Sequence, residues 1–276
     1  MEQVLKTMLE NVRAKSPLVH NITNYVTVND VANVLLAAGG SPIMSDDADD
    51  VEDITSICGG LNINIGTLNK NTIPSMFLAG KKANALGHIV LLDPVGAGAS
   101  RLRTDTANRL MQEVRFDAVR GNISEIKTLC TGSGSTKGVD ADAVDAVTEA
   151  NLDNGVQLVK TFAAQTGCII AVTGAIDLVS DGERCWCIRN GRAEMSRITG
   201  TGCQLSALMT AFLVATPDRK LDAAAAAVCM MGLAGEIGWA NMQPGDGNST
   251  YRNRIIDAIF NMTGDALEEG AKYELR

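Results

Sequence analysis

Residues 196–215 read SRITGTGCQLSALMTAFLVA, and this stretch decides how we interpret the fold. The apolar segment that ends at Ile198 predicts a short strand, and residues 199–202 predict a tight turn. A helix is expected to begin at Cys203, because apolar residues then recur at 205, 208, 209 and 212, the spacing of one buried helix face. A strand, a glycine turn and a buried helix in succession are typical of α/β folds.

The start of this helix predicts an anion-binding site. Glycines just before a helix let the chain turn sharply, so that free N–H groups and the positive end of the helix dipole point outward. A thiol in the first turn lies in the same field, which predicts a lowered pKa for Cys203. The alternative is a glycine-rich connection with a half-buried cysteine. The candidate anion hole comprises Gly200, Thr201, Gly202 and Cys203.

The composition is typical of a sheet covered by helices. The chain has 276 residues, of which 46% are hydrophobic and only 4% aromatic. A net charge of −8 with no basic stripe argues against nucleic acid as a partner. We expect a cytoplasmic protein that binds no membrane, because no leader sequence begins the chain and its longest apolar run, residues 223–233, is too short to span a bilayer.

Strand and helix patterns alternate along most of the chain. Residues 89–93 and 169–173 are continuous apolar runs, which indicate strands buried on both faces. The Asp-Gly and Asn-Gly pairs at 181–182 and 190–191 predict antiparallel ribbons. With no internal repeat and no linker, the sequence predicts a single domain over residues 1–276. Its fold class is α/β, a three-layer α/β/α arrangement with a mainly parallel central sheet, helices on both faces and no separate lid domain.

Several polar residues follow predicted strands, at the edge where ligands bind in open α/β sheets. Asp93 ends a buried strand, Arg120 and Glu125 belong to a second strand end, and Thr173 ends a third. Together with the glycine turn they predict a site that handles phosphate. Each residue also has a structural alternative. Asp93 could accept a backbone N–H in a turn, Arg120 could form a surface ion pair, and Glu125 could complete a capping box with Asn122.

Three further features are interpreted as structural. His20 and His88 stand alone, without a partner at a telling spacing. Cys185 and Cys187 lack a second pair to complete a metal site, so buried reduced thiols are favoured. Residues 132–138 have the composition of a Walker loop but not its spacing, and we expect a solvated loop there.

Seven blocks of sequence, taken in order, resemble one family. They are HNITNYV at 20–26, PIMS at 42–45, NIGTL at 64–68, LDPVGAG at 92–98, RGNISE at 120–125, VTG at 172–174 and ITGTGC at 198–203. The set is similar to the hydroxyethylthiazole kinase family of thiamin salvage, within the ribokinase-like superfamily, and it spans nearly the whole chain. One departure is visible at 245–251, where GDGNSTY stands in place of the expected Gly-x-Gly-Ser-Phe block.

The resemblance implies a reaction and its central residues. The protein would transfer the γ-phosphoryl group of ATP to the primary hydroxyl of 4-methyl-5-(2-hydroxyethyl)thiazole. By position, Cys203 would face that hydroxyl, where most of the superfamily has Asp. Glu125 would organise Mg²⁺ through water, and Asp93 would complete the magnesium environment.

The resemblance also implies where the substrates lie and how the chain assembles. Arg120 and Thr173 would hold the nucleotide phosphates. Met44 and Gly200 would contact the thiazole. A homotrimer is implied as well, with active sites between neighbouring subunits.

Three other functions stay open from the residues. The first is a sibling ribokinase-like kinase that acts on a pyrimidine or pyridoxal alcohol, against which the blocks at 20–26 and 42–45 argue. The second is an acyltransferase with Cys203 as its nucleophile, which would need a base beside the thiol. The third is a non-catalytic protein that binds the thiazole without turning over ATP.

Overall fold

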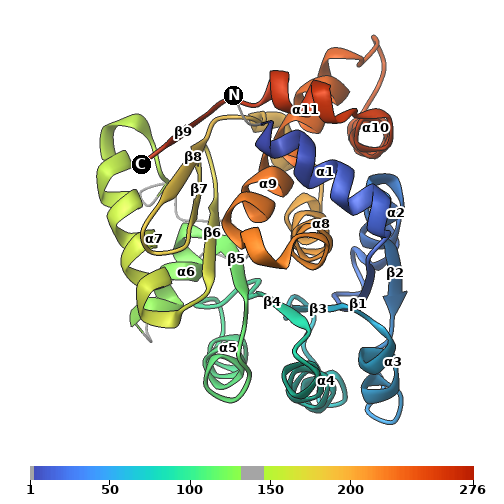
Figure 1. Cartoon of the computed structure of the whole chain (residues 1–276), viewed down its shortest axis with the longest axis vertical. Coiled ribbons are helices and arrows are strands. Elements are labelled where there is room, and N and C mark those ends of the chain that lie inside the picture. The colour runs from blue at the N-terminus through green and yellow to red at the C-terminus, as the bar shows by residue number, and fades with distance from the viewer. Residues whose placement is uncertain (1–2, 132–145) are drawn as a thin grey trace.

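A sheet of nine strands runs through the part of the chain that the computed structural model describes, residues 3–131 and 146–276 (Figure 1). Its strands lie in the order β2-β1-β3-β4-β5-β6-β7-β8-β9. The pairs from β2 to β6 are parallel, and those from β6 to β9 are antiparallel. The strands are β1 Leu18–Ile22, β2 Ser41–Met44, β3 Gly60–Asn64, β4 Ile89–Asp93, β5 Ala118–Asn122, β6 Ile169–Thr173, β7 Asp177–Ser180, β8 Cys185–Ile188 and β9 Tyr273–Leu275.

Helices cover both faces of this sheet. Figure 1 shows α8 and α9 on one side and α4 and α5 on the other. The helices are α1 Val4–Lys15, α2 Val28–Ala38, α3 Val51–Ile57, α4 Thr72–Leu86, α5 Arg101–Glu113, α6 Ile123–Thr131, α7 Leu152–Thr166, α8 Thr201–Ala215, α9 Lys220–Ala240, α10 Asn248–Asn261 and α11 Gly264–Gly270. Helix α8 packs on β1, β3 and β4, whereas α9 packs on β6, β7 and β8. The predicted three-layer α/β/α class, with a mainly parallel sheet, is therefore confirmed.

Strand β4 is apolar from Ile89 to Leu92 because each face of the sheet contacts its own core. Along β4, Ile89 and Leu91 belong to the core beneath α8 and α9, whereas Val90 and Leu92 belong to the core beneath α4 and α5. Successive side chains of a strand point to opposite faces, so a strand covered on both sides reads as an unbroken apolar run. This is the physical basis of the correct prediction for residues 89–93.

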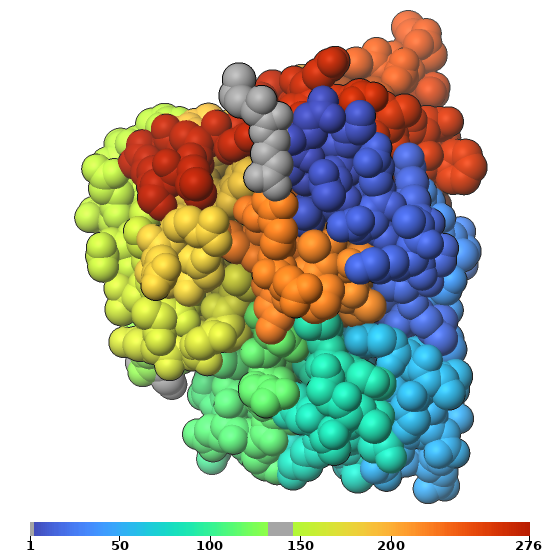
Figure 2. Space-filling view, viewed as in Figure 1, coloured from blue at the N-terminus to red at the C-terminus, as the bar shows by residue number. Residues whose placement is uncertain are grey.

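Helix α9 is the central helix of one layer. Within the described residues, one helical segment, Pro217–Ala240, is long and apolar enough to cross a membrane by length and composition, and 78% of its apolar window is buried inside the fold. Helix α1 and the C-terminal helix α11 contact each other beside it, and Figure 2 shows these two chain ends as neighbouring surfaces. Burial by sheet and helices thus accounts for the apolar character of α9.

Two local predictions were wrong, and two elements were not predicted. The segment that ends at Ile198 is a 3₁₀ helix, Ala193–Arg197, rather than a strand, and α8 begins at Thr201 rather than at Cys203. Residues 248–270 form two helices, α10 and α11, because Thr263 caps the second by accepting a hydrogen bond from the Ala266 amide at 3.1 Å. Helix α3 and strand β9 were not predicted. The loop predicted at 132–138 lies outside the described residues.

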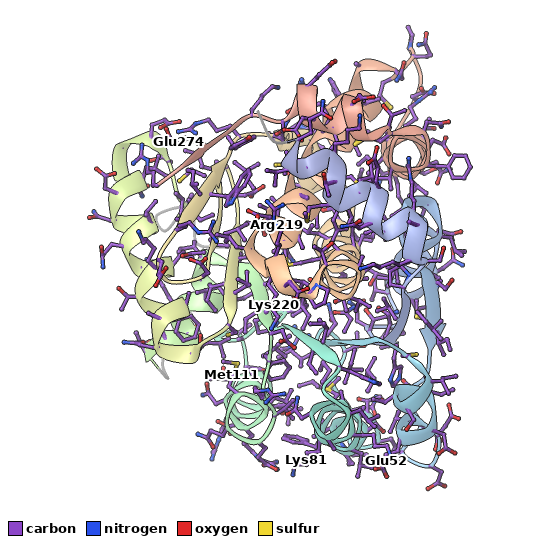
Figure 3. The ribbon with its side chains drawn as sticks, in the orientation of Figure 1. Glu52, Lys81, Met111, Arg219, Lys220 and Glu274 are labelled. Atoms are coloured by element: carbon purple, nitrogen blue, oxygen red, sulfur yellow. The ribbon has the colours of Figure 1, made fainter. Side chains whose placement is uncertain are left out.

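The parallel strands place the candidate residues at one edge of the sheet. Asp117 immediately precedes β5, so it marks the amino-terminal edge, where its Oδ1 lies 2.7 Å from Nζ of Lys220 at the start of α9. Figure 3 labels Lys220 beside the middle of the sheet. Asp93 and Thr173 are the last residues of β4 and β6. They therefore lie at the opposite, carboxyl edge, the usual ligand side of such sheets.

Candidate active site

Asp93 is a fully buried carboxylate at the end of β4. Its Oδ2 accepts hydrogen bonds from Asn64 Nδ2 at 2.7 Å and from Ser206 Oγ at 2.8 Å, and Arg120 Nη1 lies 3.8 Å away. Within the described part of the chain, its Oδ1 is buried without a hydrogen-bond partner. Burial raises the pKa of Asp93, and the Arg120 charge and the two hydrogen bonds oppose that rise. One oxygen is therefore fixed, and the other is free for a ligand.

Arg120 connects three of the predicted elements. Its guanidinium donates a hydrogen bond to Thr173 Oγ1 on the neighbouring strand β6 and forms the ion pair with Asp93 on the other neighbour, β4. The guanidinium also lies against the start of α8, since a Cβ added at Gly202 would be only 2.4 Å from Nη1. Only glycine leaves room for this contact. The arginine side chain is 12% exposed and pairs with a fully buried carboxylate, so the alternative of a surface ion pair is wrong.

Glu125 performs the predicted capping role and a second one. Its Oε2 accepts from the Asn122 amide at 2.7 Å, while Asn122 Oδ1 accepts from the Glu125 amide at 2.8 Å. This reciprocal pair is a capping box. Its Oε1 also accepts from the Gly96 amide at 2.8 Å, which fixes the loop after β4. Burial, together with the negative charge of Asp93, raises the pKa of Glu125 to about 7.

The pKa of Glu125 makes the stability of the ligand-free protein depend on pH. The ordinary pKa is 4.5, so as the pH rises the unfolded chain loses this proton before the folded protein does. Stability is therefore expected to fall between about pH 4.5 and pH 7, by about 3 kcal/mol. Urea unfolding across this range measures the fall. Glu125→Gln should make the fall in stability over this pH range smaller. Glu113→Gln, which alters an exposed ion pair, should not. An unchanged fall in Glu125→Gln would contradict the assignment.

The start of α8 is a left-handed glycine turn that packs against Thr27, the residue before α2. Gly200 has a φ of +88°, in the left-handed region, and a Cβ there would lie 2.2 Å from Thr27 Cγ2. Glycine is therefore required on two grounds. The first backbone bond of α8 runs from the Gln204 amide to the Gly200 carbonyl at 2.9 Å. The amides of residues 201–203 precede that bond, as at any helix start.

Cys203 lies in the first turn of α8 and is only 8% exposed. Asn24 Nδ2 lies 3.1 Å from its sulfur, and the side chain belongs to an apolar cluster against which Met44 packs. The predicted lowering of its pKa is wrong for the ligand-free protein. Burial and then the charge of Asp93 raise the pKa of Cys203, and they outweigh the Arg120 charge and the nearby amide groups of Asn64 and Asn24. The sequence-based prediction considered only the field of the helix and left out burial and the Asp93 charge, which have the larger effects on this pKa.

A cavity of about 160 Å³ opens beside this cluster. It lies at the carboxyl ends of β1, β2 and β3, and its lining is mixed, with Met44, Met76 and Val28 as apolar members and Asn64 as a polar one. Met44 lines the cavity and also packs against the apolar cluster that contains Cys203, so this side chain touches both. A small, partly apolar molecule could therefore bind in this cavity, on the side of Met44 that the apolar cluster of Cys203 adjoins.

The structure brings together the residues that the sequence placed far apart. A continuous set of contacts joins Thr173, Arg120 and Asp93, and Asn64 and Asn24 continue it to Cys203. Asn24, Asn64 and Ser206 were missed. The alternation of residues 61–65, with Asn62 and Asn64 at every second position, carried a signal, because two buried amides on one strand face require partners.

Two structural predictions are confirmed. His20 is buried, and its ring nitrogens lie 2.9 Å from Thr55 Oγ1 and 2.9 Å from the Ser45 carbonyl oxygen. Cys185 and Cys187 are both buried and reduced. Cys185 and Cys187 lie on β8, away from the candidate site, whereas His20 holds the backbone of Ser45, a residue that lines the cavity.

Comparison with known proteins identifies the family. The model of the hydroxyethylthiazole kinase family matches residues 9–265. A hydroxyethylthiazole kinase of Clostridium acetobutylicum is 58% identical over 271 residues, which are 98% of this chain and 99% of the relative. Another, of Ruminiclostridium cellulolyticum, is 47% identical over 96% of this chain and 95% of the relative.

Solved structures agree with this result. A hydroxyethylthiazole kinase protein from Pyrococcus horikoshii OT3 has a TM-score of 0.88 at 32% identity, covering 100% of both chains. A pyridoxal kinase from Staphylococcus aureus, in complex with AMP-PCP and pyridoxal, has a TM-score of 0.60 at 13% identity, covering 94% of this chain and 98% of that one, and shares the fold alone. The chain therefore belongs to the hydroxyethylthiazole kinase family, whose ribokinase-like enzymes use ATP to phosphorylate hydroxyethylthiazole.

Proposed function

We propose that the carboxyl edge of the sheet is the active site at which this kinase phosphorylates the primary hydroxyl of 4-methyl-5-(2-hydroxyethyl)thiazole. One observation carries the proposal: Arg120 contacts Asp93, Thr173 and the start of α8 at the same time. A carboxylate, a guanidinium, a hydroxyl and a helix start in mutual contact supply the charges that a transferring phosphoryl group requires.

Each group then has a defined task. Arg120 and Thr173 bind the nucleotide phosphates, because a guanidinium forms paired hydrogen bonds with phosphate oxygens. The amides of Gly200, Thr201, Gly202 and Cys203 face the charge that develops on the γ-phosphoryl oxygens. Phosphoryl transfer has a loose transition state, so position and charge matter more than a strong base.

The residues fit a magnesium ion that keeps most of its water. Asp93 Oδ1 is buried and unpartnered among the described residues, and this is the kind of oxygen that Mg²⁺ binds. Both Glu125 oxygens already accept backbone hydrogen bonds, so Glu125 would reach the ion through water. In the described part of the chain, no three His, Cys, Asp or Glu side chains gather, which fits an ion held mainly by water and phosphate. The ion would neutralise phosphate charge.

The thiazole is assigned to the cavity beside Cys203. Met44 supplies an apolar wall, and Gly200 permits close approach of the backbone at the start of α8. The hydroxyl would then face Sγ of Cys203, which accepts its proton late in the reaction. A bound cation would offset the Asp93 charge that raises the pKa of this thiol.

A homotrimer would complete this cavity. Tyr25 and Val28 line it and are 76% and 38% exposed, and the adjacent Val26 is 56% exposed. Apolar side chains exposed at the rim of a site favour cover by a second subunit. Light scattering measures the assembly, and a monomeric active enzyme would contradict the proposed homotrimer.

We further propose one catalytic domain over residues 1–276. We also propose a cytoplasmic enzyme that binds neither membrane nor nucleic acid.

The function is tested by ATP consumption with hydroxyethylthiazole and by mass detection of the phosphate ester. Pyridoxal and hydroxymethylpyrimidine serve as competing alcohols, and the thiazole is expected to have the largest kcat/KM. Binding of the thiazole without ATP turnover would instead support the non-catalytic alternative.

Cys203→Ala tests the role of the thiol. We expect kcat to fall about 100-fold, the ordinary contribution of a positioned proton acceptor, with KM changed less than about threefold. Cys229→Ala, at a buried thiol on α9, is the control and should retain full turnover. Wild-type turnover in Cys203→Ala would remove the thiol from the mechanism.

A further inference from the structure

Two buried asparagines join Cys203 to Asp93. Asn64 Nδ2 donates to Asp93 Oδ2 at 2.7 Å, and Asn64 Oδ1 accepts from Asn24 Nδ2 at 3.1 Å. The same Nδ2 of Asn24 lies 3.1 Å from Cys203 Sγ. Asn64 and Asn24 are 1% and 5% exposed, so water does not compete for these contacts.

The amide of Asn64 has one possible orientation. Its Oδ1 also accepts from the Gly66 amide at 2.9 Å, and a backbone N–H can only donate. On the other side of the amide, Asp93 Oδ2 accepts a hydrogen bond, so the group that faces it is the donor Nδ2. A flipped amide would place NH₂ against N–H and oxygen against the carboxyl oxygen. Asn64 is therefore fixed from both ends.

The fixed amide of Asn64 in turn fixes Asn24. Because Asn64 presents an oxygen, Asn24 must present its NH₂ group, and its Oδ1 then accepts from Thr27 Oγ1 at 3.1 Å. This leaves a second N–H of Asn24 facing Cys203 Sγ. A Cβ at Gly66 would lie 2.9 Å from Asn64 Oδ1 and 3.1 Å from Asn24 Nδ2, so glycine permits the two amides to meet.

We propose that Asn64 is a positioning residue that acts on Cys203 through Asn24. Asn64 holds Asn24 so that an N–H, and never an oxygen, faces the sulfur. A donor there occupies one lone pair of sulfur, stabilises negative charge on it and leaves its remaining acceptor capacity on the side away from Asn24. This inference rests on the proposed catalytic role of Cys203, and its tests are chosen so that the two can fail separately.

The first test is a double-mutant cycle on kcat, measured at saturating ATP, thiazole and Mg²⁺. Asn64→Leu keeps the side-chain volume and removes both hydrogen-bonding groups. We expect kcat to fall about 10-fold to 100-fold, the range for losing a hydrogen bond to a charged group, with KM changed less than about threefold. In a Cys203→Ala background the same change should have less than about a threefold effect. An equal loss in both backgrounds would overturn the proposal, because Asn64 would then act through Asp93.

The second test does not depend on catalysis. Iodoacetamide labelling of the free enzyme, followed by peptide mass spectrometry, gives the alkylation rate of Cys203. Asn64→Leu and Asn24→Leu should each slow it about tenfold at neutral pH, because the sulfur loses its donor. An unchanged or faster rate would overturn the proposal. If Cys203→Ala retains full turnover while labelling slows as expected, the proposed catalytic role fails and the positioning inference stands.

Asn62 provides the matched control. It is fully buried on the same strand face, and it donates to Asn21 Oδ1 rather than to the contacts that lead to Cys203. Asn62→Leu removes a buried amide from the same strand face and should lower stability in urea unfolding, yet leave the labelling rate of Cys203 within about twofold. If Asn64→Leu does not fold, Asn24→Leu tests the same contact from the loop before α2, without altering β3.

Discussion

Asp93→Asn is expected to lower kcat about 1,000-fold while the protein remains folded. The carboxylate contributes charge at the only position where Arg120, the start of α8 and a free buried oxygen meet in the described structure. Electrostatic groups and metal-binding carboxylates at such a position each contribute several kcal/mol to transition-state stabilisation. The amide oxygen can still accept the hydrogen bonds from Ser206 and Asn64, so the free energy of unfolding should change by less than about 2 kcal/mol.

Asp117→Asn is the matched control for this prediction. Asp117 also lies at a strand end and pairs with a cation, Lys220, but at the opposite edge of the sheet. Its replacement should leave kcat unchanged within about twofold, because Asp117 lies at the opposite edge of the sheet. The free energy of unfolding should also change little, because partly exposed ion pairs contribute about 1 kcal/mol or less to stability. Steady-state ATP consumption and urea unfolding check both variants. A kcat for Asp93→Asn within tenfold of wild type would contradict the central role of this carboxylate.

The parts of the fold that the sequence predicts well are those fixed by local patterns. A run such as residues 89–93 reports burial on both faces by itself, and the capping box of Asn122 and Glu125 lies within four residues. Strand β9 carries no such pattern. It has three residues and exists because β8 offers an edge to pair with, a contact between distant parts of the chain. Helix α3 is short and acidic, and its sequence likewise carries no local pattern that predicts a helix.

The residues of the candidate site also fall into two groups, those that local patterns predict and those whose role depends on distant parts of the chain. Asp93, Thr173 and Gly200 are found from the sequence because a strand end and a helix start are local features. Asn64 is not, because its role depends on register: β3 pairs with β4 so that Asn64 stands opposite Asp93. The error on the pKa of Cys203 has this origin too. The helix dipole can be read from neighbouring residues, whereas burial and the Asp93 charge come from segments 110 residues away in the chain.

Arg120→Leu is expected to lower kcat/KM for ATP about 1,000-fold and to destabilise the protein by about 3 kcal/mol. The first effect follows from the loss of a paired hydrogen-bonding cation for phosphate. The second follows because Asp93 would remain buried with no cation within reach among the described residues. The pKa of Asp93 should then rise further, so the loss of stability should be larger at pH 8 than at pH 5.

Arg120→Lys separates charge from geometry. Lysine keeps the positive charge, so most of the stability should return and the pH dependence should approach that of wild type. A single ammonium cannot contact Asp93 and Thr173 on separate strands and also lie against Gly202, as the guanidinium does. We therefore expect kcat/KM for ATP to remain at least about 100-fold low. ATP titrations and urea unfolding at the two pH values check this. Full recovery of activity by lysine would mean that charge alone suffices, and that the contact of Arg120 with three elements is not what binds the phosphates.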